Sequence, residues 1–88
     1  MNADVMTLRE LEQTILSLAR LMVDESDAVR IEVLSKPTET LLRLHVAPTD
    51  TGILIGKQGR TARSLRILLG SIGMKYRHAI SLDIVANR

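Results

Sequence analysis

Hydrophobic residues near the N-terminus recur at steps of three and four, the spacing of one face of an α-helix. The apolar positions are Leu8, Leu11, Ile15, Leu18 and Met22. Thr7 and Glu10 have the spacing of a capping box, so the pattern predicts a helix over about residues 7–23 that begins at Thr7. The stripe covers barely two heptads, which favours packing on the chain's own domain over a coiled coil.

Two segments with alternating apolar and polar residues follow this helix. The apolar positions are Val29, Ile31 and Val33 in the first segment and Leu42, Leu44 and Val46 in the second. A period of two is typical of half-buried strands. The turn-forming residues Lys36-Pro37-Thr38-Glu39 separate the segments, so the pattern predicts an antiparallel hairpin.

The C-terminal half contains a short helix, a longer helix and a strand. Pro48 ends the second strand, and Thr49 or Asp50 can cap a short helical turn over residues 51–55. A longer helix is predicted from Arg60 to about Ile72, with Gly73 as its C-terminal cap. The apolar positions are Ala62, Leu65, Leu69 and Ile72 in this helix, and Ile80, Leu82 and Ile84 in the final strand.

The predicted order of elements is therefore α-β-β-α-turn-α-β, an α+β arrangement. With 88 residues and 45% hydrophobic content, the chain has room for one domain with one core. We expect a single domain over residues 1–88, with an N-terminal helix over about 7–23 and a core over about 28–85. Neither repeats nor a linker divide the sequence.

Charge divides the chain into two unlike halves. Residues 1–50 contain five cations and nine anions, a net charge of −4, whereas residues 51–88 contain seven cations and one anion, a net charge of +6. The overall charge of +2 thus conceals a strongly basic half, as expected of a surface that binds a polyanion. A membrane surface is a weaker alternative, because the cations accompany a tight turn and no broad aromatic face.

The basic half is centred on the turn Gly56-Lys57-Gln58-Gly59. Two glycines allow a sharp bend and a close approach to phosphate oxygens. The predicted helix that follows would direct its first free N–H groups and the positive end of its dipole at the same phosphate. Alone, the pattern is equally typical of an ordinary connection between two helices.

Catalysis and metal binding find little support in the residue types. There is no cysteine, and the two histidines, His45 and His78, belong to different elements and are interpreted as surface residues. We predict no enzymatic activity and no cofactor. No leader and no apolar segment of membrane-spanning length is visible, so we expect a cytoplasmic protein without a membrane partner.

The short helix, the sequence Ile-Gly-Lys-Gln-Gly-Arg over residues 55–60, the longer helix and the closing strand together resemble a K-homology (KH) domain. The preceding helix and strand resemble the type II variant. This resemblance implies a type II KH-like fold, with helices packed on one face of a three-stranded sheet. The run from Val46 to Arg60 is similar, more specifically, to the small stand-alone bacterial KH proteins of the KhpA family.

The resemblance implies that the glycine turn clamps the backbone of about four nucleotides of single-stranded RNA. The residues implied in RNA binding are Leu54, Ile55, Gly56, Lys57, Gln58, Gly59, Arg60, Arg63 and Arg66. Leu54 and Ile55, with Leu65, would floor the groove, although core packing explains Ile55 and Leu65 equally well. The three arginines would follow phosphates, or remain solvated surface charges.

The family also implies a role as an RNA chaperone or post-transcriptional regulator in bacteria, with effects on cell shape. Implied partners are a second copy of the chain and a larger KH-containing protein similar to KhpB. Relatives tend to carry a cation where this chain has Ile53, which suits a protein contact beside the groove. The alternative function is therefore a dimerisation or interaction subunit whose partner holds most of the RNA.

Overall fold

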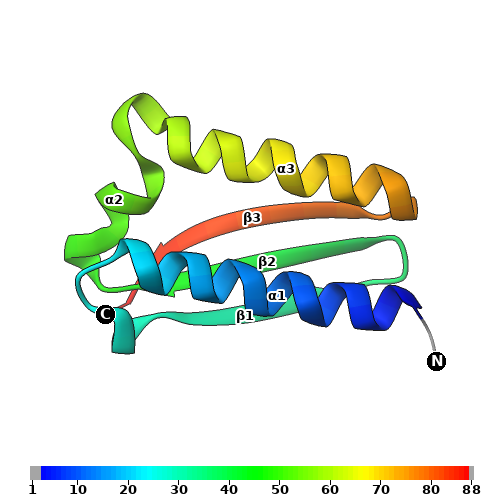
Figure 1. Ribbon diagram of the computed structural model, residues 1–88, viewed down its shortest axis with the longest axis horizontal. Helices are drawn as coiled ribbons and strands as arrows, with labels where there is room; N and C mark the ends of the chain where they lie inside the picture. The colour runs from blue at the N-terminus through cyan, green and yellow to red at the C-terminus, as the bar shows by residue number, and fades with distance from the viewer. Residues whose placement is uncertain (1–2, 88) are drawn as a thin grey trace.

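The computed structural model describes residues 3–87, and these form three α-helices and a three-stranded sheet joined by short 3₁₀ turns (Figure 1). The helices are α1 (Ala3–Met22), α2 (Thr51–Ile55) and α3 (Arg60–Tyr76), and the strands are β1 (Arg30–Ser35), β2 (Glu39–Val46) and β3 (Ala79–Ala86). The predicted order of elements and the α+β, type II KH-like fold class are confirmed.

The sheet has the strand order β1-β2-β3. The predicted hairpin is confirmed, since β1 and β2 pair antiparallel and the Lys36 N–H donates to the Glu39 carbonyl at 2.8 Å. The chain then crosses over through α2 and α3, so β3 pairs parallel to β2. As a result, β1 and β3 are the two edges of the sheet.

The core lies between the sheet and the helices α1 and α3. Alternation along β2 turns Leu42, Leu44 and Val46 toward the helices, and none of them is more than 2% exposed. Leu11 and Ile15 of α1 belong to the same buried cluster, together with residues of α2, α3 and β3. Burial weakens toward the β1 edge, where Val33 is 37% exposed.

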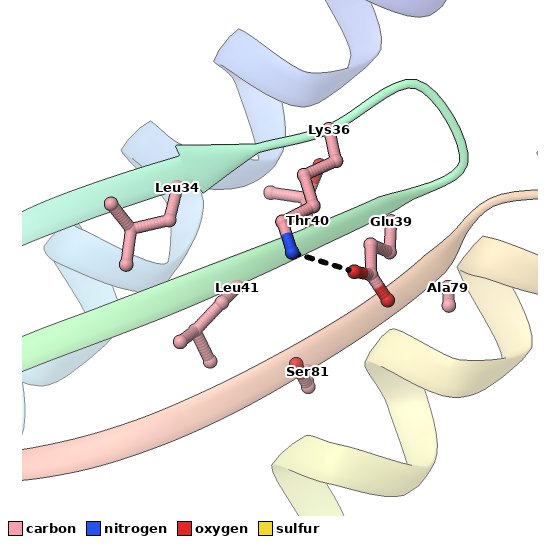
Figure 2. A pocket seen from close by; sticks show the side chains of 7 residues that line it. All are labelled: Leu34, Lys36, Glu39, Thr40, Leu41, Ala79 and Ser81. Atoms are coloured by element: carbon pink, nitrogen blue, oxygen red, sulfur yellow. Dashed lines mark ion pairs between the residues drawn. The ribbon is translucent and has the colours of Figure 1, made fainter.

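The opposite side of the sheet, which we call the open face, carries no helix among the described residues. Figure 2 views this face near the hairpin, with Leu34, Leu41 and Ser81 directed away from the helices. These residues line a shallow pocket whose edge holds an exposed ion pair between Lys36 and Glu39, with 3.4 Å between Nζ and Oε1.

Two helix ends differ from the sequence prediction. α1 begins at Ala3, so the predicted start at Thr7 is wrong: Thr7 lies inside the helix, and no glycine or proline interrupts the residues before it. α3 continues past Gly73 to Tyr76, and its C-cap is Arg77, which has a left-handed backbone with φ 53°. Gly73 serves a different purpose, because a Cβ there would collide with the carbonyl oxygen of His78.

Asp50 also differs from its predicted role as a helix cap. It occupies the N-cap position of α2 but makes no capping bond. Its carboxylate instead accepts hydrogen bonds from the backbone N–H groups of Glu25 at 2.9 Å and Asp24 at 3.4 Å. Since Asp50 is only 1% exposed, it fastens the end of α1 to the segment that leads into α2.

Candidate nucleic-acid interface

The turn from Gly56 to Gly59, which we call the glycine corner, has a backbone that its sequence explains. Gly56 has φ 80° and ψ 169°, and a Cβ at this position would collide with the side chain of Thr61. Gly59 has φ 73°, in the left-handed region that glycine adopts without strain. Both glycines are therefore required by conformation, and Gly56 by close packing as well.

The two residues between the glycines are directed into solvent. Lys57 and Gln58 are exposed, and Gln58 has a left-handed backbone with φ 57°. The Arg60 guanidinium donates to the Gln58 side-chain oxygen at 3.0 Å. No side chain of the described residues caps α3, and the first N–H group of the helix, that of Arg60, donates to the backbone carbonyl of Lys57. Lys57 and Arg60 thus place two cations at one corner, beside the positive end of the α3 dipole.

Arg63 and Arg66 continue this basic surface along α3. Both are exposed, but they differ in their contacts. Arg66 Nε donates to the backbone carbonyl of Leu82 in β3 at 3.1 Å, so this side chain bridges the helix and the strand. Among residues 8–87, whose side chains the structure describes, Arg63 makes no ion pair or side-chain hydrogen bond.

The carbonyl that Arg66 reaches belongs to the free edge of β3. The Ala79 N–H donates to the Thr38 carbonyl just before β2, and the Asn87 N–H donates to the Val46 carbonyl at the end of β2, so odd-numbered residues of β3 bond toward β2. Backbone groups of alternate residues in a parallel strand point to opposite sides. The N–H and C=O groups of Leu82 and its even-numbered neighbours therefore face the flank of α3 that carries Arg66.

The apolar residues before the corner separate into buried and exposed ones. Leu54 is 1% exposed and belongs to the core, so its side chain supports the turn and is not open to a ligand. Ile55 is 43% exposed and Ile53 is 37% exposed, and both lie on the surface of α2. Leu65 is partly buried against the core, in agreement with the packing interpretation.

The histidines are less exposed than the sequence indicated. His45 is buried, 9% exposed, with Nε2 3.1 Å from the Glu32 carboxylate and Nδ1 3.3 Å from the Arg30 guanidinium. His78 Nε2 lies 2.6 Å from the Thr40 hydroxyl. The interpretation of His45 as a plain surface residue is wrong, because its contacts with Glu32 and Arg30 join two strands and are invisible in the local pattern, whereas His78 is partly exposed in the segment between α3 and β3.

Among the side chains of residues 8–87, no three histidine or acidic groups gather as ligands for a metal ion. In the same range, no helix combines the length and the apolar character needed to cross a membrane. What the surface around α2 and α3 offers is a cationic turn at the start of a helix, exposed isoleucines and a strand edge. This combination, on this fold, defines a KH domain of type II.

Comparison with known proteins agrees with that class. The family described as KhpA/KhpB, KH domain matches residues 12–84. The RNA-binding protein KhpA of Aquifex aeolicus is 39% identical over 67 residues, covering 76% of this chain and 85% of that protein. The KhpA proteins of Listeria monocytogenes and Bacillus subtilis are 36% and 34% identical, covering 85% and 90% of this chain and 99% and 98% of theirs. The chain belongs to the KhpA/KhpB family of KH domains, which confirms the resemblance found in the sequence.

Proposed function

We propose that this chain binds single-stranded RNA at the glycine corner and along the adjoining flank of α3. The observation that carries the proposal is that Lys57, Arg60 and Arg63 form no ion pair among the described residues, around a turn whose glycines hold it open. Relatives named as RNA-binding proteins support the choice of RNA as the polyanion.

Each part of the corner has a distinct task in this proposal. The positive end of the α3 dipole and the Lys57 ammonium hold one phosphate, since anions bind at helix N-termini. Arg60 and Arg63 hold neighbouring phosphates. Ile55 supplies an apolar surface for a base, and the free edge of β3 offers backbone groups to base edges. Leu54 contributes by fixing the turn from within the core.

Binding of this kind needs no chemical step, so the proposed role is an RNA chaperone or post-transcriptional regulator in the cytoplasm, without enzymatic activity. Contacts to phosphates and a short stretch of bases allow many RNA sequences to bind. The effects on cell shape implied by the family would then follow from the RNAs that are held.

A second candidate function is a protein-interaction subunit, favoured by the apolar residues on the helical surface. Ile53 is 37% exposed, and Ile67, Leu68 and Met74 of α3 are 62%, 60% and 82% exposed. Exposed apolar residues of this size mark protein contacts when they cluster. The partners would be a second copy of the chain or a larger KhpB-like protein that holds most of the RNA.

Titration of a labelled single-stranded RNA with the isolated protein across a salt series tests the first function against the second. Each phosphate neutralised on a single strand contributes about −0.7 to the slope of log affinity against log salt, so three contacts give a slope of about −2. A folded chain that binds no RNA at low salt, or binds with a slope near zero, would contradict RNA binding at the corner and favour the interaction subunit.

A further inference from the structure

A second pocket lies on the flank of α3 beyond Arg66. It is lined by Gly70, Gly73, Met74, Arg77, His78 and Ile80, at the end of α3 and the start of β3. Arg63, Arg66, Gly70 and Gly73 follow one another at steps of three and four, so they share one flank of α3, and Arg77 follows as the C-cap of the helix. The pocket is therefore continuous with the surface that begins at the glycine corner and borders the same free edge of β3.

Gly70 is the residue whose presence the fold does not explain. A glycine inside a helix costs roughly 0.5 to 1 kcal/mol relative to alanine. Gly73 is required because a Cβ would strike the His78 carbonyl, whereas a Cβ at Gly70 would meet no atom within 4 Å. The space beside Gly70 is open, and the absence of a side chain there keeps the pocket accessible from solvent.

The chemistry of the pocket suits a flat, weakly polar group attached to an anionic chain. Met74, 82% exposed, and the partly buried Ile80 provide polarizable and aliphatic surface. Arg77 is exposed at the rim, and an arginine can stack on a base or contact its phosphate. α3 contains no acidic residue, so nothing on this helix repels a polyanion.

The distance along the helix fixes which part of the RNA can reach the pocket. Gly70 is eleven positions after Gly59, roughly 16 Å along α3 at 1.5 Å per residue. A stacked strand advances about 3.4 Å per nucleotide, so the pocket lies roughly five steps from the corner. The loop of a KH domain clamps about four nucleotides.

We propose that the pocket beside Gly70 receives the base of a nucleotide beyond the four held at the corner, so that the site extends along all of α3. This inference rests on the proposed function, because the strand must first be held by Lys57 and Arg60. It predicts that RNAs longer than four nucleotides bind more tightly than a tetranucleotide. The gain in affinity should depend on contacts with Gly70, Met74 and Ile80.

The test compares oligouridylates of four and eight nucleotides with the wild-type protein, Gly70→Leu and Ser71→Leu. Leucine at position 70 fills the pocket, whereas the exposed Ser71 lies next to it on the outer surface of α3 and is the matched control. Wild type and Ser71→Leu should bind the octamer more tightly than the tetramer by about threefold to tenfold. Gly70→Leu should bind the tetramer normally and lose most of that gain.

The outcomes separate this inference from the proposed function. Absence of binding to either RNA by wild type would overturn the proposed function. Binding of the tetramer with an equal gain for the octamer in all three proteins would overturn the pocket alone. A change in sedimentation of Gly70→Leu with unaltered RNA binding would assign the pocket to a protein side chain and likewise overturn the inference. Amide shifts of Gly70 and Ile80 that respond to the octamer and not to the tetramer would support it.

Discussion

The open face of the sheet and the glycine corner both carry arginines, but only on the open face does an arginine form ion pairs with acidic side chains. On the open face, the Arg43 guanidinium lies 3.8 Å from Glu32 and 4.0 Å from Asp83, and Arg30 lies beside His45. At the corner, no acidic side chain of the described residues pairs with the cations. Two surfaces with similar residue types therefore present different fields to a polyanion.

The difference shows that the placement of acids decides which cations remain unpaired for a polyanion. Asp83 is the only acid after residue 50, and the alternation of β3 turns it toward Arg43 on the open face. Arg43, from the acidic half of the sequence, meets Asp83 and Glu32 there. The fold thus removes the single nearby anion from the corner and leaves the cations unopposed.

The strongest test of this contrast is to reverse the charge at the corner. Lys57→Asp with Gln58→Asp places two carboxylates where phosphates approach, so RNA affinity should fall at least tenfold, or about 1.4 kcal/mol. Both side chains are exposed, so the melting temperature should change little. Lys36→Asp at the hairpin is the control and should leave RNA affinity unchanged. Undiminished binding by the folded double variant would remove the corner from the site.

A second test concerns Ile53, the exposed apolar residue beside the corner. If two copies associate through this surface, Ile53→Lys should raise the dimer dissociation constant by about fivefold to tenfold, because roughly a third of an isoleucine's burial is lost in each copy. Sedimentation at several concentrations measures this. A wild-type protein that remains monomeric at tens of micromolar would show that Ile53 forms no such contact.

A smaller effect should distinguish arginines of the two surfaces. Arg63→Ala should reduce the magnitude of the salt slope of RNA binding by about 0.7, which corresponds to one phosphate contact. Arg43→Ala on the open face should leave the slope unaltered, as should Arg9→Ala and Arg20→Ala on α1. Binding curves at four salt concentrations provide the measurement. Equal changes in slope for Arg63 and Arg43 would mean that ion pairing does not separate the two surfaces.

The smallest effect is expected from the open face itself. Glu32→Gln removes the carboxylate that Arg43 and His45 share. Partly exposed ion pairs contribute little, so the free energy of unfolding should decrease by no more than about 1 kcal/mol. RNA affinity should stay the same. A several-fold gain in affinity would reveal that the open face binds RNA once its cations are released.

Local periodicity was sufficient to predict the elements and the corner. These predictions rest on patterns that span only a few residues. Examples are the alternation around Leu42 and Leu44, the turn at Pro37 and the paired glycines. The start of α1 was missed because the apparent capping box at Thr7 lies inside a longer helix. The end of α3 was missed because Gly73 is a glycine for packing reasons, against His78, and not for its backbone angles.

Contacts between distant segments could not be predicted from the sequence pattern. The sequence around Asp50 contains no pattern that predicts hydrogen bonds to its carboxylate from backbone N–H groups about 25 positions earlier. Likewise, the sequence gives no reason to distinguish Arg66 from Arg63. The parallel pairing of β3 places the Leu82 carbonyl 3.1 Å from Arg66 Nε. Such contacts depend on the complete fold, which also places Asp83 of the basic half beside Arg43 of the acidic half.

The crossover between β2 and β3 has a consequence for folding and turnover. The β1–β2 hairpin closes over a few residues, whereas β3 pairs only after a long segment containing α2 and α3 has been closed, which is slower and costs more entropy. The glycine corner lies inside that segment. RNA that binds only the finished corner therefore stabilises the whole fold, by about 2.7 kcal/mol at a hundred times the dissociation constant. We expect the lifetime of the chain against proteolysis to rise with the supply of RNA.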